Sequence, residues 1–205
     1  MRKFIGFLAI AASVLFSFAV SAAEDNFEDG AYTKVKGTYT PNTLVEYFSF
    51  FCGHCVRFQP TMRDLERDFP EVKFSRVPVA FLGGDLGNKM QSLYAFAEQK
   101  GVEDKFTELM FEQVKKAQAA GDKGQIDPLE VFGALGITKD DLDAGMNNIL
   151  TNSRVVQYDN MVKDQEIEGT PTMVVDGIYR INTDHVKSYE YLKELIKYLQ
   201  AKKGA

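Results

Sequence analysis

Cysteine is scarce in this sequence of 205 residues, which contains only Cys52 and Cys55. No third cysteine is present, so neither of the two can form a structural disulfide with another part of the chain. Their spacing, Cys-Gly-His-Cys, instead allows the two thiols to close one small, strained and reducible ring. The shortage of cysteine therefore excludes a disulfide-stapled scaffold and predicts a redox-active pair.

Histidine is equally scarce, which argues against a metal centre. A structural zinc site takes four ligands, but the chain offers two cysteines and two histidines, and His185 is far from His54 in the sequence. A c-type haem site needs a histidine directly after the second cysteine, where Val56 stands. We therefore expect neither a metal nor a cofactor.

Only one long apolar run is present, and it lies at the N-terminus. Residues 4–20 are almost continuously apolar, follow Arg2 and Lys3, and lead into Ser21-Ala22-Ala23. A basic start, a short apolar segment and a small-residue cleavage site are typical of a secretory signal. A membrane anchor is the alternative, but the run is short for a spanning helix. We predict a signal peptide over residues 1–23 and a soluble, exported mature protein.

Positive charge is in deficit. The chain carries 24 Lys and Arg against 29 Asp and Glu, and removing residues 1–23 takes away two cations and no anion, which changes the net charge from −5 to −7. An acidic protein is poorly suited to bind nucleic acid, so no nucleic-acid partner is expected. Export also places the two cysteines in a compartment where disulfide chemistry is sustained.

Hydrophobic patterning predicts an α/β fold. The apolar run at 43–51 predicts a buried strand, the stretch 56–69 a helix, and the alternation at 72–79 a second strand. Such a β-α-β unit favours a parallel strand pair with a right-handed crossover. Near the C-terminus, Asp176-Gly177 between two apolar runs predicts a hairpin. An edge strand at 32–39 and a final helix at 189–201 complete this part of the prediction.

A long segment with helical periodicity separates these two parts. Three glycines within residues 83–87 introduce it, and Asp127-Pro128 and the pair Thr138 and Asp141 are helix-start signals within it. A further helix is predicted at 155–161. The predicted domains are an α/β domain formed by 24–82 and 161–205, and an inserted helical domain at 83–160.

Several motifs together resemble the DsbA-type thioredoxin-fold oxidoreductases and span essentially the whole mature chain. They are Glu46-Tyr47-Phe48-Ser49-Phe50-Phe51-Cys52-Gly53-His54-Cys55, Phe81-Leu82-Gly83-Gly84-Asp85-Leu86-Gly87, Gly101-Val102-Glu103-Asp104-Lys105, Gly169-Thr170-Pro171-Thr172-Met173 and Asp176-Gly177. The resemblance implies a thioredoxin fold with an inserted all-helical domain. It also implies a periplasmic enzyme that introduces disulfide bonds into unfolded or reduced exported proteins and is reoxidised by a quinone-linked membrane oxidase of the DsbB type. We expect a monomer.

The dipeptide between the cysteines departs from the family pattern. The family's usual pair is Pro-His, whereas this chain has Gly53-His54, which is similar to the dipeptide of protein disulfide isomerases. The reaction class is unaffected, but an isomerase or reductase becomes an alternative to an oxidase. Isomerases of the bacterial periplasm usually carry a separate dimerisation domain, for which no room is visible, so we favour the oxidase. A peptide-binding holdase with dispensable cysteines is a third alternative.

Cys52 is the expected attacking cysteine. At the N-terminus of a helix its sulfur would face unpaired backbone N–H groups and the positive end of the helix dipole, which favour the thiolate. His54 would add positive charge or a hydrogen bond. Cys55, one turn later and less exposed, would resolve the mixed disulfide.

Three further residues complete the candidate site. Glu46 lies in an otherwise apolar strand, so its carboxyl is expected to be partly buried with a raised pKa, unless it points outward. The resemblance implies that Glu46 exchanges protons with Cys55. It also implies that Pro171 follows a cis peptide bond beside the disulfide, where the Thr170 backbone pairs with an extended substrate; an ordinary trans turn is the alternative.

Overall fold

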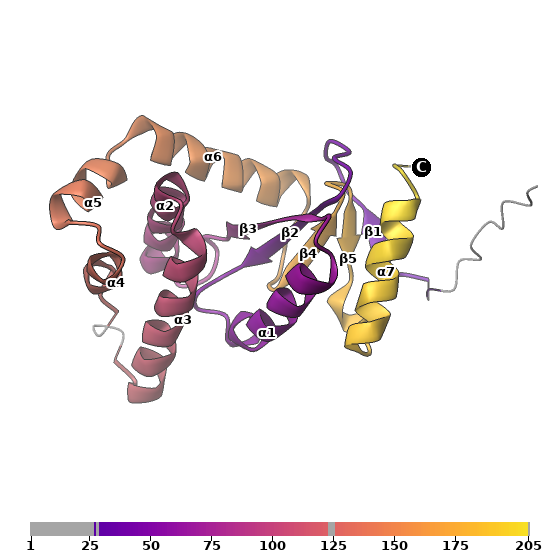
Figure 1. The fold of residues 1–205 in the computed structure, drawn as a ribbon, viewed down its shortest axis with the longest axis horizontal. Coiled ribbons are helices and arrows are strands. Elements are labelled where there is room, and N and C mark those ends of the chain that lie inside the picture. The colour runs from indigo at the N-terminus through magenta and orange to yellow at the C-terminus, as the bar shows by residue number, and fades with distance from the viewer. Residues whose placement is uncertain (1–26, 28, 123–125, 205) are drawn as a thin grey trace, which may run out of the picture.

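A five-stranded mixed sheet forms the centre of one half of the molecule (Figure 1). The computed structural model describes residues 27, 29–122 and 126–204, so the predicted signal peptide lies outside the described residues. The strand order is β1-β5-β4-β2-β3, and only β2 and β3 are parallel to each other. The strands are β1 (Tyr32–Lys34), β2 (Thr43–Phe48), β3 (Lys73–Pro78), β4 (Thr172–Val175) and β5 (Tyr179–Ile181).

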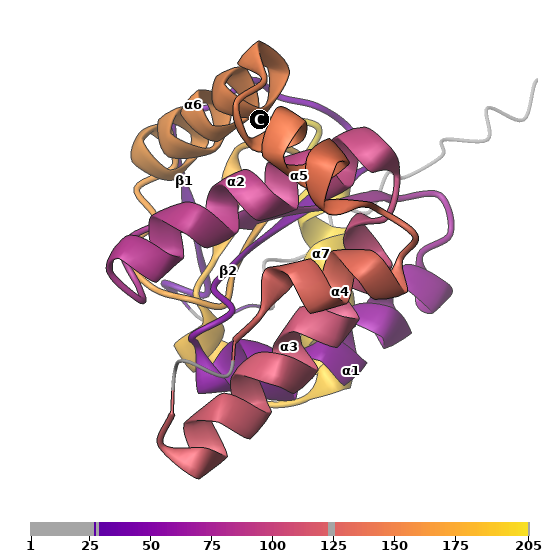
Figure 2. The same cartoon turned by 90° about the vertical axis from the view of Figure 1, so that its left-hand side faces the viewer.

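Helices cover both faces of this sheet. Helices α1 (Gly53–Asp68) and α7 (Tyr189–Ala201) lie on one face, and a helical block between β3 and β4 in the sequence covers the other (Figures 1 and 2). The block consists of α2 (Asp85–Lys100), α3 (Glu103–Ala120), α4 (Pro128–Ala134), α5 (Lys139–Met146) and α6 (Ile149–Asp164). Within it, α2 contacts α3, α5 and α6. The predicted thioredoxin fold with a helical insertion is thus confirmed.

Strand β2 separates two hydrophobic cores. Leu44 packs with Leu65 of α1 and Leu195 of α7, whereas Val45 and Tyr47 belong to the core shared with the helical block. This is the alternation expected of a strand whose two faces are both covered. Glu46 follows the direction of Leu44, so its carboxylate faces α1.

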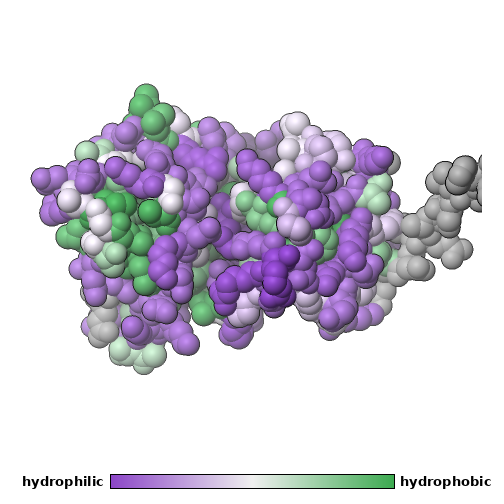
Figure 3. Space-filling model, in the orientation of Figure 1, coloured by the Kyte–Doolittle hydropathy of each residue, from purple (hydrophilic) through white to green (hydrophobic). Residues whose placement is uncertain are grey.

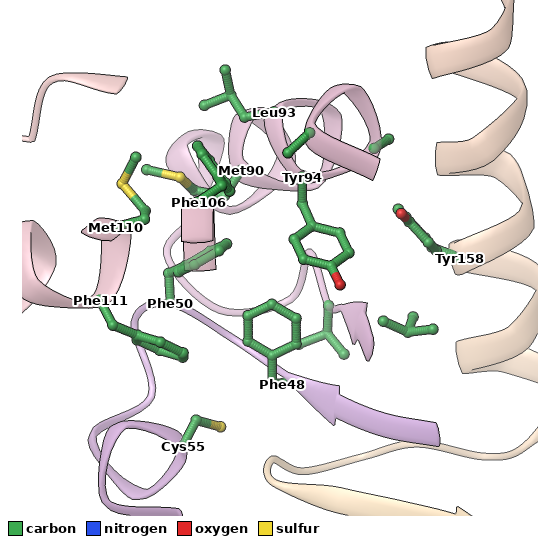
Figure 4. Packing of buried hydrophobic residues seen from close by; sticks show 14 of the residues in the cluster. Phe48, Phe50, Cys55, Met90, Leu93, Tyr94, Phe106, Met110, Phe111 and Tyr158 are labelled. Carbon is green, nitrogen blue, oxygen red and sulfur yellow. The ribbon is translucent and has the colours of Figure 1, made fainter. Parts of the chain in front are cut away.

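Aromatic side chains join β2 and the segment after it to the helical block (Figure 4). The rings of Phe48 and Phe50 lie 5.0 Å apart edge to face, Tyr94 of α2 lies 5.5 Å from Phe48, and Phe111 of α3 lies 5.1 Å from Phe50. Burying one such ring stabilises the fold by roughly 2–3 kcal/mol. The segment that leads to Cys52 is therefore held firmly in place.

The start of α1 differs from the sequence prediction in a way that matters for the cysteines. Strand β2 ends at Phe48 instead of residue 51, because a turn begins at Ser49, whose carbonyl oxygen accepts a hydrogen bond from the Cys52 N–H at 3.1 Å. Helix α1 begins at Gly53 instead of residue 56. Cys52 is therefore the N-cap residue of α1.

Other boundaries shift without changing the element order. The hairpin at Asp176-Gly177 is confirmed, but Val175 pairs with Tyr179, so the loop has three residues. Strand β1 is shorter than the predicted 32–39, and α6 is longer than the predicted 155–161. Residue 160, the predicted end of the inserted domain, lies within helix α6. The domain boundaries stay a prediction. The helix starts at Asp127-Pro128 and at Thr138, with its reciprocal capping box to Asp141, are confirmed.

The surface seen in Figure 3 is mostly polar, and its largest apolar area lies over the helical block. Exposed apolar side chains there include Leu129 on α4 and Ile149, Leu150 and Val156 on α6. Within the described part of the chain, every helix is too short or too polar to span a bilayer.

Candidate active site

The sulfur of Cys52 caps the first turn of α1. Its Sγ accepts a hydrogen bond from the Cys55 backbone N–H at 3.3 Å, while the Cys52 backbone keeps the extended conformation usual for an N-cap. The first N–H groups of a helix have no intrahelical partner, so the sulfur satisfies donors that would otherwise be unpaired. Both cysteines are free thiols; Cys52 is 9% exposed and Cys55 is fully buried.

The two thiols have opposite acidities. Burial alone would raise the pKa of Cys52, but the nearby side chains of Thr170 and Cys55 and hydrogen bonds from the backbone N–H groups of Cys55 and His54 outweigh it, and the net pKa is lowered. Burial raises the pKa of Cys55 far above its ordinary value. Cys52 is therefore the better thiolate, and Cys55 is the thiol that needs a proton when a disulfide between the two opens.

The loop before β4 lies directly against Cys52. The Cys52 thiol donates to the carbonyl oxygen of Thr170 at 3.3 Å. The Thr170–Pro171 peptide bond is cis, as predicted, and the alternative of a trans turn is excluded. The structure thus brings Cys52, Cys55, Thr170 and Pro171 together, although the two pairs lie far apart in the sequence.

The position of the His54 side chain differs from the expected hydrogen bond with Cys52. Its side chain is exposed on α1, and no hydrogen bond joins its imidazole to Cys52, although both are described residues. Its backbone N–H, by contrast, helps to lower the Cys52 pKa. The imidazole lines a groove of about 630 Å³ with Arg57 and Phe58 on one side and the Thr170–Met173 segment on the other. His54 therefore faces the space beside the cysteines.

Glu46 is fully buried on β2, so the alternative that it points outward is excluded. Gln59 of α1 donates to the Glu46 carboxylate at 3.4 Å and to the Cys55 carbonyl oxygen at 3.3 Å, and so connects the acid with the buried cysteine. Burial raises the pKa of Glu46 to about 7, although Arg76 acts in the opposite direction. The predicted raised pKa is confirmed, and at that value Glu46 can both take and give a proton near neutral pH.

Arg76 is a residue of this site that the sequence analysis missed. It lies opposite Glu46 in the parallel pairing of β2 with β3, and its Nε donates to the Glu46 carboxylate at 3.2 Å. Its side chain is 10% exposed and also contacts Glu66 and Asp104. One sequence signal could have identified Arg76: it is an arginine within the alternating strand pattern at 72–79, and the neighbouring strand β2 also carries a single charged residue, Glu46.

Comparisons with known proteins show the family of this chain. The model of the DSBA-like thioredoxin domain family matches residues 43–197. The thiol:disulfide interchange protein DsbA of Escherichia coli K12 is 35% identical over 96% of this chain and 98% of its own length. DsbA of Yersinia pestis is 36% identical over 83% of each chain.

Solved structures agree as well. DsbA from Klebsiella pneumoniae has a TM-score of 0.74 and 28% identity, covering 86% of this chain and 98% of that one. A Proteus mirabilis DsbA variant in complex with a non-covalently bound peptide has a TM-score of 0.75 and 30% identity, covering 86% and 99%. The chain belongs to the DsbA-like thioredoxin family, and it is accordingly a thiol:disulfide oxidoreductase that introduces disulfide bonds.

Proposed function

We propose that Cys52 and Cys55 form the redox disulfide of this enzyme and that it acts mainly as a dithiol oxidase. The observation that carries the proposal is the unequal acidity of the two thiols. The backbone N–H groups at the start of helix α1 stabilise a Cys52 thiolate, which favours the reduced enzyme. A stabilised reduced form makes the oxidised form a stronger oxidant.

The reaction proceeds in two exchanges. A substrate thiolate attacks Sγ of Cys52; a mixed disulfide forms, and the Cys52–Cys55 bond breaks with its electron pair on Cys55. Glu46 supplies the proton that the buried Cys55 requires. A second substrate thiolate then attacks the substrate sulfur of the mixed disulfide and displaces Cys52 as a thiolate. Two substrate thiols are oxidised to a disulfide, and the enzyme gains two electrons.

Extended segments of unfolded or reduced exported proteins are the proposed substrates. The Thr170 backbone borders the groove beside Cys52, where an extended chain can pair by strand addition. The peptide complex of Proteus mirabilis DsbA supports this assignment. The proposed location is the periplasm, and the proposed oxidant of the reduced enzyme is a quinone-linked membrane oxidase of the DsbB type, acting on a monomer.

The redox equilibrium of the mature protein with glutathione, read by thiol alkylation, tests the oxidase assignment. We expect a potential of about −120 to −150 mV, near the oxidising end of the thioredoxin superfamily. A potential near or below about −200 mV would instead favour the isomerase or reductase that the Gly53-His54 dipeptide suggests.

A holdase is the second candidate, because apolar side chains are exposed on α4 and α6. Complementation of a disulfide-deficient strain separates the two activities. A Cys52→Ser variant that retained full biological activity would favour the holdase, and complete loss of activity would favour the oxidoreductase.

A further inference from the structure

Arg76 binds three carboxylates, each from a different element of the fold. Its Nε donates to Glu46 of β2 at 3.2 Å, its Nη2 to Glu66 of α1 at 2.7 Å, and its Nη1 to Asp104 of α3 at 2.6 Å. Glu46 is fully buried, whereas the side chains of Glu66 and Asp104 are 36% and 83% exposed. The two short bonds of the guanidinium therefore go to the acids nearer the solvent.

Of the three carboxylates, the buried Glu46 receives the longest hydrogen bond from Arg76. A guanidinium can form two parallel hydrogen bonds with one carboxylate, and this bidentate pairing is the strongest form of the ion pair. Glu46 receives only one bond from Arg76, through Nε, while Nη2 donates to Glu66 and Nη1 to Asp104. Its second oxygen has only a 3.4 Å contact from Gln59.

The surroundings of Glu46 contain few other charges. Arg76 faces it from β3, and Gln59 and Glu66 of α1 interact with it; its partner on β4 is the apolar Met173. Tyr94 of α2 and Asp104 of α3 act on Arg76. Burial is the largest influence on the pKa of Glu46; Arg76 lowers that pKa and Glu66 raises it.

We propose that Asp104 and Glu66 are positioning residues for the exchange reaction. By holding two sides of the Arg76 guanidinium, they prevent it from forming a two-bond ion pair with Glu46 and keep Glu46 able to exchange a proton near neutral pH. Because Asp104 lies in the first turn of α3, the second helix of the helical block, the docking of that block also sets the protonation state of Glu46. The inference rests on the proposed role of Glu46 and adds the residues that control it.

Two isosteric variants, Asp104→Asn and Glu66→Gln, test the inference. Each removes one negative charge and one strong acceptor, so Arg76 is freed to pair with Glu46, and both effects favour the ionised acid. Glu108→Gln is the matched control, since Glu108 lies one turn after Asp104 on α3 and pairs with Lys105 at 2.7 Å rather than with Arg76. The measurement is the rate of exchange with a dithiol peptide between pH 5 and 9, at constant ionic strength.

We expect the midpoint of the pH–rate transition to move to lower pH by about 0.5 unit in both variants and to stay in place in the control. A titration of the Glu46 carboxyl carbon by NMR should show the same shift. If Asp104→Asn and Glu66→Gln change only the thermal stability and move neither midpoint, the two residues are merely structural and the inference is overturned.

A Glu46→Gln variant distinguishes failure of this inference from failure of the proposed mechanism. Loss of the transition in Glu46→Gln, together with unmoved midpoints in Asp104→Asn and Glu66→Gln, overturns the inference and leaves the role of Glu46 intact. A transition that persists unchanged in Glu46→Gln overturns both.

Discussion

The Cys52 thiol donates a hydrogen bond to the carbonyl oxygen of Thr170 at 3.3 Å, across 118 residues of sequence. This contact joins the N-terminus of α1 to the loop that leads into β4, and Thr170 is followed by the cis bond to Pro171. The reactive sulfur therefore lies beside backbone that is not part of a strand. In the proposed reaction, the substrate contacts the Cys52 sulfur and the Thr170 backbone at the same time.

The acidity of Cys52 predicts selective alkylation. In the reduced protein, the rate of Cys52 alkylation should reach half of its maximum at a pH below the ordinary pKa of a cysteine thiol. Cys55 should stay unmodified until the protein unfolds, because it is fully buried and its pKa is raised. Mass spectrometry after a short iodoacetamide pulse at each pH measures both. Equal labelling of the two cysteines would contradict the assignment of Cys52 as the attacking residue.

Replacing either cysteine should block turnover at different steps. Cys55→Ser retains the attacking sulfur of Cys52 but lacks the resolving thiol, so with reduced substrate and an oxidant we expect stable mixed disulfides at Cys52. Cys52→Ser should form none and should lose at least about a thousandfold in oxidation rate. Non-reducing gels with a thiol-reactive peptide distinguish the variants. Equal trapping by both would refute the division of roles.

Glu46 predicts a pH dependence of stability. Its pKa is about 7 in the folded protein, against an ordinary value of 4.5 for a glutamate, so the folded state binds the proton more tightly. The stabilisation that follows is complete below pH 4.5 and is lost as the pH rises through 7, a loss of about 3 kcal/mol. Glu46→Gln does not titrate, so its stability relative to the unmodified protein should rise by about that amount between pH 4.5 and 8.

Urea unfolding of both reduced proteins at several pH values measures this difference. Cys52 also titrates, so a Cys52→Ser background removes its contribution from both curves. Two stability curves that run parallel from pH 4.5 to 8 would show that Glu46 does not have the raised pKa.

Gly53 predicts that the family's usual proline is tolerated. Gly53 is the first residue of α1, a position that proline favours, and the extended backbone of Cys52 suits a residue before proline. A Cβ there would have only Arg57 Nη1 within contact range, at 3.6 Å. Gly53→Pro should stabilise the protein by about 0.5–1 kcal/mol, because it restricts the unfolded chain.

Thermal unfolding of the reduced protein measures the gain, with Gly133→Ala in α4 as a comparison, since a Cβ at Gly133 meets nothing within 4 Å. Destabilisation by Gly53→Pro would mean that the first turn of α1 needs glycine. The redox potential of the same variant reports how far the dipeptide itself sets the oxidising power.

Much of the fold could be predicted from local patterns. The turn at Asp176-Gly177, the cap at Asp127 and the capping box at Thr138 are confirmed, because each depends on residues within a few positions of one another. The order of strands and helices follows from hydrophobic periodicity in the same way. Element ends were less predictable: 49–51 is as apolar as a strand, yet a turn at Ser49 ends β2 there.

Two cysteines three residues apart, with no other cysteine in the chain, already specify thiol–disulfide exchange at the level of the amino-acid sequence. The side chains and backbone groups that surround these cysteines follow from packing between distant segments. The contacts of Cys52 with Thr170 and of Arg76 with Glu46 and Asp104 join elements that lie far apart in the chain. Packing of the sheet against α1 and α3 creates these contacts, and packing between distant segments leaves no periodic signal in the sequence.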